Sequence, residues 1–294
     1  MNKYYLGVLL IILSTLGFSV MPIFAVYAYT GGISVSTLLF LRFLIAAIIL
    51  SVYIFFKYKK PTVSKRDLVF LFILGGVFYT LQSTCYFTSL KFISPSLTAF
   101  LLYTYPIIVS VLSFFIEKER ITLKLVVSMA LSFVGIFTFL RAAAYEIDIR
   151  GILLALTAAF IYSCYILLGN KVVKQLNSMV VTTFVSTFAS VGLLLLGIAR
   201  GEFSFDFQAF VWLPIMGLTL FSTILAIFSF FSGMELLGPT KSSILSMLEP
   251  VFTATLSLIL FHELLEPIQL LGGIAVLVGA GLAVVSKSKE IRSA

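Results

Sequence analysis

The sequence predicts an all-α integral membrane protein with ten transmembrane helices, arranged as two inverted repeats of five helices each. Hydrophobic residues make up 61% of the 294 residues and charged residues only 11%, whereas soluble domains carry about 25% charged residues. The apolar residues form ten runs, each long enough to cross a hydrocarbon core of ~30 Å as a helix. The two halves also match each other at a constant offset of 144 residues.

Short polar connections separate the ten apolar runs, so no soluble domain is expected between them. The runs lie near residues 4–29, 34–56, 68–90, 94–116, 121–141, 149–170, 177–199, 208–234, 239–261 and 267–286. Each run is continuous and far longer than the ~10 alternating residues of a barrel strand, which predicts helices. The first run follows Lys3 as a signal sequence would, but its length and its match to the sixth run favour an uncleaved span.

Glycine, proline and glutamate positions carry the internal repeat. The matched pairs are Gly7 and Gly151, Ser19 and Ser163, Pro95 and Pro239, Pro106 and Pro250, Glu119 and Glu263, and Gly135 and Gly279. We expect the repeats at residues 1–144, with spans 1–5, and 145–294, with spans 6–10. Because five is odd, the second copy inserts upside down relative to the first. Inverted repeats are typical of secondary transporters that bind substrate at the midplane between the copies.

Basic residues indicate the orientation of the spans. The segments on one side of the membrane hold 14 Lys and Arg residues and those on the other side hold four. Cytoplasmic loops carry the excess of positive charge, so both termini are expected in the cytoplasm and the protein in the plasma membrane. The net charge of +8 lies in these clusters, which indicates a lipid bilayer as partner and no nucleic acid.

Three segments resemble a known family. They are "LRFLIAAIIL" in span two, "YFTSLKFISPSLTAFLLYTYPIIVSVLSFFIEKERIT" across spans three and four, and "MELLGPTKSSILSMLEPVFTATLSLILFHELL" across spans eight and nine. On these residues the chain is similar to the drug/metabolite transporter superfamily, in its EamA-type ten-span branch. The resemblance implies a central cavity lined by spans 1–4 and 6–9, peripheral spans 5 and 10, and export of amino acids or other metabolites.

Glu249 is the most informative single residue of the sequence. It lies ten residues into span nine, about 15 Å from the start of the helix and near the midplane. A carboxylate at that depth is costly unless it is paired, faces water or is protonated, so Glu249 is a candidate substrate and proton site, with a structural acid as the alternative. Pro250 follows it and is expected to kink the helix and free the carbonyl of Ser246. The repeat partner of Glu249 is Tyr105, so the two halves differ chemically at this point.

Arg42 lies eight residues into span two, roughly 12 Å deep and thus at a depth similar to that of Glu249. One hypothesis is that the two pair in the unloaded state and that a zwitterionic substrate competes with the pair. The alternative is a fixed structural ion pair, or an Arg42 bonded to backbone carbonyls.

Further polar side chains fall inside the spans. Tyr79, Gln82 and Tyr86 share one helical face and predict that span three is a cavity wall, although a membrane tyrosine can also anchor at an interface or pack in the bundle. The full set of such residues is Ser14, Ser19, Tyr79, Gln82, Tyr86, Tyr103, Tyr162, Tyr165, Ser222, Thr223 and Ser246. The predicted cavity set is Glu249, Arg42, Tyr79, Gln82, Tyr86, Tyr103, Tyr105, Tyr162 and Ser246, and the predicted bending points are Pro22, Pro106 and Pro250.

Other features are weaker. Glu119 and Glu263 each precede a helix, where an acid suits the helix dipole. Ala275, Gly279 and Ala283 form a stripe of small residues that fits either close packing within the chain or a homodimer. His262 lacks the second histidine of a zinc-protease helix, and no phosphate-binding loop is present. The sequence therefore predicts no enzyme, no catalytic residue, no metal and no cofactor.

The expected function is secondary active transport of small organic metabolites, namely amino acids or related zwitterions, by export and by alternating access around a midplane site. A first alternative is a proton-coupled exchanger of hydrophobic or quaternary cations, with Glu249 as the counter-charge among aromatic rings. A second alternative outside transport is a membrane receptor or an assembly subunit.

Overall fold

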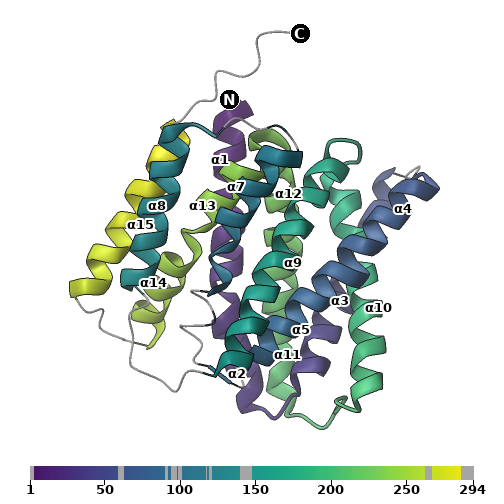
Figure 1. The fold of residues 1–294 in the computed structure, drawn as a ribbon. Helices are drawn as coiled ribbons and strands as arrows, with labels where there is room; N and C mark the ends of the chain where they lie inside the picture. Colours follow the sequence, from purple (N-terminus) through teal and green to yellow (C-terminus); the bar gives the residue numbers. More distant parts are fainter. Residues whose placement is uncertain are drawn as a thin grey trace.

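The computed structural model describes residues 3–58, 63–89, 92–93, 98, 101–116, 118, 121–139, 148–261 and 267–285. Within these ranges every regular element is a helix (Figure 1). The first half holds α1 (Lys3–Ser19), α2 (Met21–Thr30), α3 (Val35–Tyr58), α4 (Lys65–Phe72), the π-helix η1 (Ile73–Tyr79), α5 (Thr80–Ser89), α7 (Tyr105–Ile116) and α8 (Leu123–Phe139).

The second half follows a similar order, with the single helix α9 in the place of α1 and α2. It holds α9 (Ile149–Val173), α10 (Ser178–Arg200), the 3-10 turn η2 (Ala209–Val211), α11 (Trp212–Gly217), the π-helix η3 (Leu218–Leu225), α12 (Ala226–Leu237), α13 (Pro239–Ser246), α14 (Glu249–Phe261) and α15 (Pro267–Val285).

Polar residues start and stop these apolar helices. Ser64 accepts a hydrogen bond from the N–H of Asp67 at the start of α4, and Asp148 and Asn177 cap α9 and α10 in the same way. Such caps satisfy backbone donors that have no partner inside the helix. At the other end of α10, Gly201 adopts a left-handed conformation with φ 62°, a common way for a helix to end.

Six helical stretches in the described ranges are long and apolar enough to cross a membrane. They are 3–30, 35–57, 65–89, 149–173, 178–200 and 209–237. The segments predicted as spans four, five, nine and ten contain shorter or interrupted helices, namely α7, α8, the pair α13 and α14, and α15. The prediction of an all-helical, multi-pass membrane protein is confirmed, and the count of ten spans stays a prediction.

Helix contacts follow the sequence offset. The helix α3 packs on its repeat partner α10, and α8 packs on its partner α15. The contact of α1 with α12 is matched by that of α9 with α5, its equivalent in the other half. Figure 1 shows α8 and α15 side by side at one edge of the bundle, with α10 at the opposite edge. The two halves therefore interlock, each supplying helices to the neighbourhood of the other.

Repeated glycines allow these close helix approaches. A Cβ atom on Gly135 would lie 2.7 Å from the carbonyl oxygen of Gly272, and one on Gly279 would lie 2.8 Å from that of Ser128. Gly272 and Ser128 are themselves 144 residues apart. The hydroxyl of Ser128 also donates to the carbonyl of Gly279 at 2.6 Å. In the predicted small-residue stripe, Gly279 thus packs within the chain, on α8.

We expect Gly279→Ala to destabilise the protein, because the added methyl group collides with the Ser128 carbonyl and the Ser132 hydroxyl. Overpacking of this kind costs about 1–3 kcal/mol. Gly281→Ala is the matched control on the same helix, since nothing lies within 4 Å of its added Cβ. Thermal unfolding of the purified variants in detergent measures the difference, and equal melting temperatures would contradict the close approach of α8 and α15.

Candidate functional site: a cavity between the two halves

A cavity of about 100 Å³, lined by aromatic rings and by several polar side chains, lies inside the helical bundle. Its walls come from α1, α2, α3, η1, α5, α7 and the turn before it, α9 and α14. Both halves of the chain therefore contribute to it. The lining residues are Phe18, Met21, Arg42, Tyr79, Gln82, Ser83, Tyr86, Phe87, Leu102, Tyr103, Tyr105, Tyr162 and Glu249.

Most of the residues predicted from the sequence meet in this cavity. Of the nine predicted cavity residues, only Ser246 is not part of the wall. Its hydroxyl donates to the carbonyl of Ser242 at 2.9 Å and also interacts with the hydroxyl of Tyr105. Ser246 thus lies behind Tyr105. Substrate binding by the residues of the wall stays a prediction.

Two equivalent helix breaks position the cavity. In the first half, Tyr103 and Thr104 form a turn before α7, and the N–H of Thr104 donates to the carbonyl of Leu101 at 3.2 Å. In the second half, the turn at Met247 and Leu248 separates α13 from α14. There the N–H of Leu248 donates to the carbonyl of Leu245 at 3.1 Å. Both bonds are of the tight i to i−3 type that ends a helix.

The prolines of the two halves start helices instead of kinking them. Pro106 and Pro250 are the second residues of α7 and α14, where the absent N–H of proline costs nothing. The expected kink within a continuous span nine is therefore wrong, because the break comes two residues before Pro250. Pro22 likewise stands second in α2, after a break at Val20, and its side chain lies outside the described structure. A hinge role for the three prolines stays a prediction.

Glu249 is the first residue of α14, and its partly buried carboxylate lines the cavity. The positive end of the helix dipole favours a carboxylate at this position. The hydroxyl of Tyr103 serves as its hydrogen-bond donor. Among the described residues, no Lys, Arg or His nitrogen lies within 4.0 Å of the carboxylate.

Arg42 is only 2% exposed, and three side chains bind its guanidinium group. Nε donates to the hydroxyl of Thr223 at 2.7 Å, Nη2 to that of Tyr79 at 3.3 Å, and Nη1 to the sulfur of Met21 at 3.2 Å. The group also lies over the ring of Phe43, 4.8 Å from its centroid. Within the described ranges it has no carboxylate partner within 4.0 Å. Among the described residues, the guanidinium group of Arg42 therefore has neither the expected pairing with Glu249 nor a bond to a backbone carbonyl.

Both π-helices contribute to the binding of Arg42. Tyr79 is the last residue of η1 and Thr223 belongs to η3, and these two π-helices occupy corresponding places in the two halves. The hydroxyl of Thr219, also in η3, donates to the carbonyl of Arg42 at 3.3 Å. π-helical turns are rare and occur often at functional sites. Arg42 thus joins the two halves at their least regular helical segments.

A series of aromatic contacts connects the surroundings of Arg42 with those of Glu249. It begins beside Arg42 and ends at the residue that donates to Glu249, and its members come from α3, η1, α9, α7 and the turn before α7. The series runs Phe43, Tyr79, Tyr165, Tyr162, Tyr105 and Tyr103, with successive ring centroids 4.9, 5.6, 5.8, 4.8 and 6.3 Å apart.

Sequence reasoning missed several apolar members of the wall, namely Phe18, Phe87, Leu102 and Met21. Met21 precedes Pro22 in the sequence, but nothing in the sequence shows that its sulfur faces a guanidinium group. The predicted features at Pro95, Glu119, His262 and Glu263 lie outside the described residues.

The fold and the cavity are those of a polytopic membrane protein that carries charged and polar side chains in an internal cavity. The family model of the EamA-like transporter family matches the chain twice, at residues 5–141 and 149–285, and the two matches begin 144 residues apart. The chain therefore belongs to the EamA-like transporter family and contains two copies of its unit.

Individual relatives agree with this assignment. The chain is 26% identical over 259 residues to "Uncharacterized transporter YetK" of Bacillus subtilis (strain 168), covering 85% of this chain and 78% of that protein. It is 25% identical over 275 residues to "Uncharacterized transporter YyaM" of the same strain, covering 90% of each. A crystal structure of another protein resembles the fold with a TM-score of 0.80 at 20% identity, covering 95% of this chain and 96% of that one. At this identity, the likeness concerns the fold alone.

We expect Arg42→Ala to lower the melting temperature of the purified protein by roughly 5–10 °C. The substitution leaves buried hydroxyl groups on both π-helices without a donor, at about 1–3 kcal/mol per group. Arg66→Ala, which removes an exposed arginine of α4, is the control. If both variants have the same melting temperature as the unaltered protein, Arg42 does not hold the two halves together.

Proposed function

We propose that this membrane transporter is a secondary active exporter of small organic metabolites, with amino acids or related zwitterions as its substrates. The observation that carries the proposal is the separation of two opposite charges in one cavity. Arg42 and Glu249 both line it, yet neither has an oppositely charged partner within 4.0 Å among the described residues. A ligand with a carboxylate and an ammonium group would satisfy both.

The size of the cavity supports a small substrate. Its volume of about 100 Å³ is well below the about 300–1,000 Å³ of sites that hold drug-sized ligands. Because a water molecule takes about 30 Å³ in the liquid, the space suits a molecule of a few heavy atoms. A larger substrate would require the helices around the cavity to move apart.

The mechanism that we propose is alternating access by rocking of two inverted halves, residues 1–144 and 145–294, around the cavity. The two equivalent helix breaks lie beside the cavity. The helices would bend during this motion at Pro22, Pro106 and Pro250. The proposal includes ten spans, cytoplasmic termini and the plasma membrane as the location.

An exchanger of hydrophobic or quaternary cations, coupled to protons, is the second candidate. The tyrosines of the wall favour it, because aromatic faces attract organic cations and Glu249 would supply the counter-charge. Competition between protons and a lipophilic cation for the same site would distinguish it from zwitterion export. Proton-driven flux that persists undiminished in Glu249→Gln proteoliposomes would exclude Glu249 as the proton site.

We expect small zwitterionic amino acids to raise the melting temperature of the purified protein, since a ligand of the native state stabilises it by about 2.7 kcal/mol at one hundred times its Kd. Screening amino acids against sugars, nucleobases and quaternary amines tests this. Glu249→Gln should lose the amino-acid shift, whereas Asp206→Asn, an exposed acid outside the cavity, should keep it. A shift with quaternary amines alone would favour the second candidate.

The proposed topology places the turn between α9 and α10 in the cytoplasm and the segment between α10 and η2 outside. After replacement of the free cysteines Cys85 and Cys164, we expect a membrane-impermeant maleimide to label Ser204→Cys in intact cells. Gln175→Cys should react only after the cells are opened. The reverse pattern would invert the topology.

A further inference from the structure

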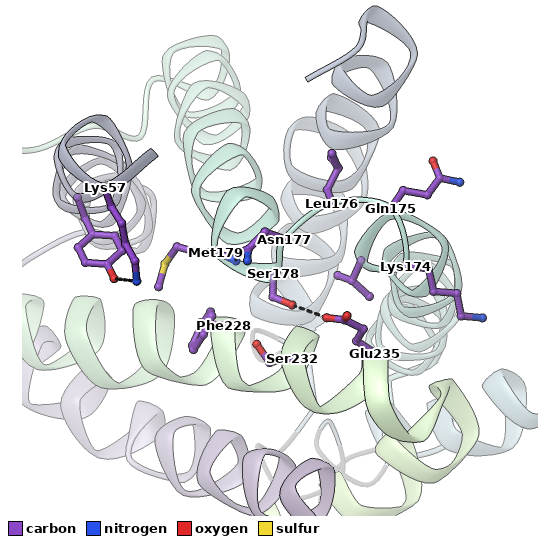
Figure 2. Close-up of a pocket in the computed structure, with 12 residues that line it drawn as sticks. Lys57, Lys174, Gln175, Leu176, Asn177, Ser178, Met179, Phe228, Ser232 and Glu235 are labelled. Atoms are coloured by element: carbon purple, nitrogen blue, oxygen red, sulfur yellow. Dashed lines mark hydrogen bonds between the residues drawn. The ribbon is translucent and has the colours of Figure 1, made fainter. Parts of the chain in front are cut away.

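Two solvent-open pockets lie at opposite ends of the paired helices α3 and α10. The larger, of about 570 Å³, lies where α3 ends and α10 begins (Figure 2). The smaller, of about 280 Å³, lies where α3 begins and α10 ends. Because α3 has 24 residues, its two ends are roughly 35 Å apart, which is about the thickness of a bilayer.

The two pockets are equivalents in the internal repeat. Five lining positions of one correspond to lining positions of the other at the offset of 144 residues. These pairs are Ser178 and Ser34, Met179 and Val35, Phe228 and Thr84, Ser232 and Thr88, and Gly197 and Tyr53. The pockets are thus one feature of the fold, built twice.

Each pocket presents an exposed carboxylate that is bound by a serine. In the larger pocket, the hydroxyl of Ser178 donates to Glu235 at 3.3 Å, as Figure 2 shows. In the smaller pocket, the hydroxyl of Ser36 donates to Glu202 at 2.6 Å. Neither carboxylate has a cationic nitrogen within 4.0 Å in the described part of the chain.

Each pocket also presents basic side chains. Lys57 and Lys174 line the larger one, and Arg200 lines the smaller one. The internal repeat does not require an acid in both pockets, because the offset of 144 residues aligns Glu235 with Lys91 and Glu202 with Tyr58. Acidic and basic side chains thus line both pockets from unrelated positions of the repeat, and in the larger pocket Nζ of Lys57 donates to the hydroxyl of Tyr53 at 2.7 Å.

We propose that the two pockets are peripheral binding sites for a zwitterionic substrate, one on each face of the membrane. This inference rests on the proposed function. Glu235 and Glu202 would attract the ammonium group, and the basic residues the carboxylate. Phe87 lines both the smaller pocket and the central cavity, so these two adjoin in this structure. The larger pocket shares no lining residue with the cavity.

The exposure of these charges determines which kinetic parameter they affect. Exposed ion pairs are weak and are screened by salt, so each peripheral site raises the local substrate concentration without holding it tightly. Loss of one acid should therefore raise KM roughly two- to fivefold at low salt on one face only. The rate at saturating substrate should not change.

The experiment uses the full chain in vesicles of both orientations, with a mixture of radiolabelled amino acids as the probe. Glu235→Gln should raise KM only for transport that starts at the face of the larger pocket, and Glu202→Gln only at the other face. Both effects should vanish at high salt, and Asp206→Asn should show neither.

The outcomes separate this inference from the proposed function. Absence of amino-acid flux in the unaltered protein overturns both. Normal flux with a KM that is unchanged, or raised equally at both faces, overturns the peripheral sites alone. A lower saturating rate with no change in KM would mean that Glu235 and Glu202 stabilise the fold, and it overturns the inference. An effect on KM that appears only in vesicles with anionic phospholipid also overturns it.

Discussion

The buried charge of Arg42 is the constraint around which the centre of this protein is organised. A guanidinium group that is 2% exposed is stable in a lipid environment only if polar groups replace its water. The chain supplies them from three irregular places: the π-helices η1 and η3 and the break between α1 and α2. Regular helices direct their polar side chains at fixed spacings, whereas a wider turn or a break changes the direction of the helix face. The irregular segments thus supply the polar partners that the buried charge of Arg42 requires.

The internal repeat builds the scaffold, and departures from it build the chemistry. Shared glycines allow helices to touch, and shared prolines start the helices that follow the two breaks. At the cavity, however, Glu249 corresponds to Tyr105, and Arg42 corresponds to Ser186, a buried hydroxyl for which the described residues offer no hydrogen-bond partner. The break at Val20 also has no equivalent, since α9 continues through the matching position. The two halves therefore share a backbone and differ in charge.

Hydropathy predicts the helical class, residue matches at the offset of 144 predict the repeat, and polar residues inside the spans predict most of the cavity wall. The cavity residues could be found because polar side chains at mid-span depth have few places to go other than a shared interior. The breaks could not be found in the same way, because an interruption of two residues leaves the mean hydropathy of a span unchanged. Pro250 indicates an irregularity on its N-terminal side, near Ser246, but not that the helix ends there and a new one begins. The partners of Arg42 depend on how the helices rotate against each other, which no local pattern encodes.

The unpaired state of Arg42 and Glu249 rests on neutral partners around each group. An ion pair across the cavity would neutralise both charges, and a substrate would have to break it. Instead, neutral donors and acceptors satisfy each charge separately: hydroxyls and a sulfur around Arg42, and the hydroxyl of Tyr103 at Glu249. The rings from Tyr79 to Tyr103 contact one another in series, from the surroundings of Arg42 to those of Glu249, beside the cavity that both groups line. Arg42 and Glu249 are thus each satisfied by neutral partners within one cavity.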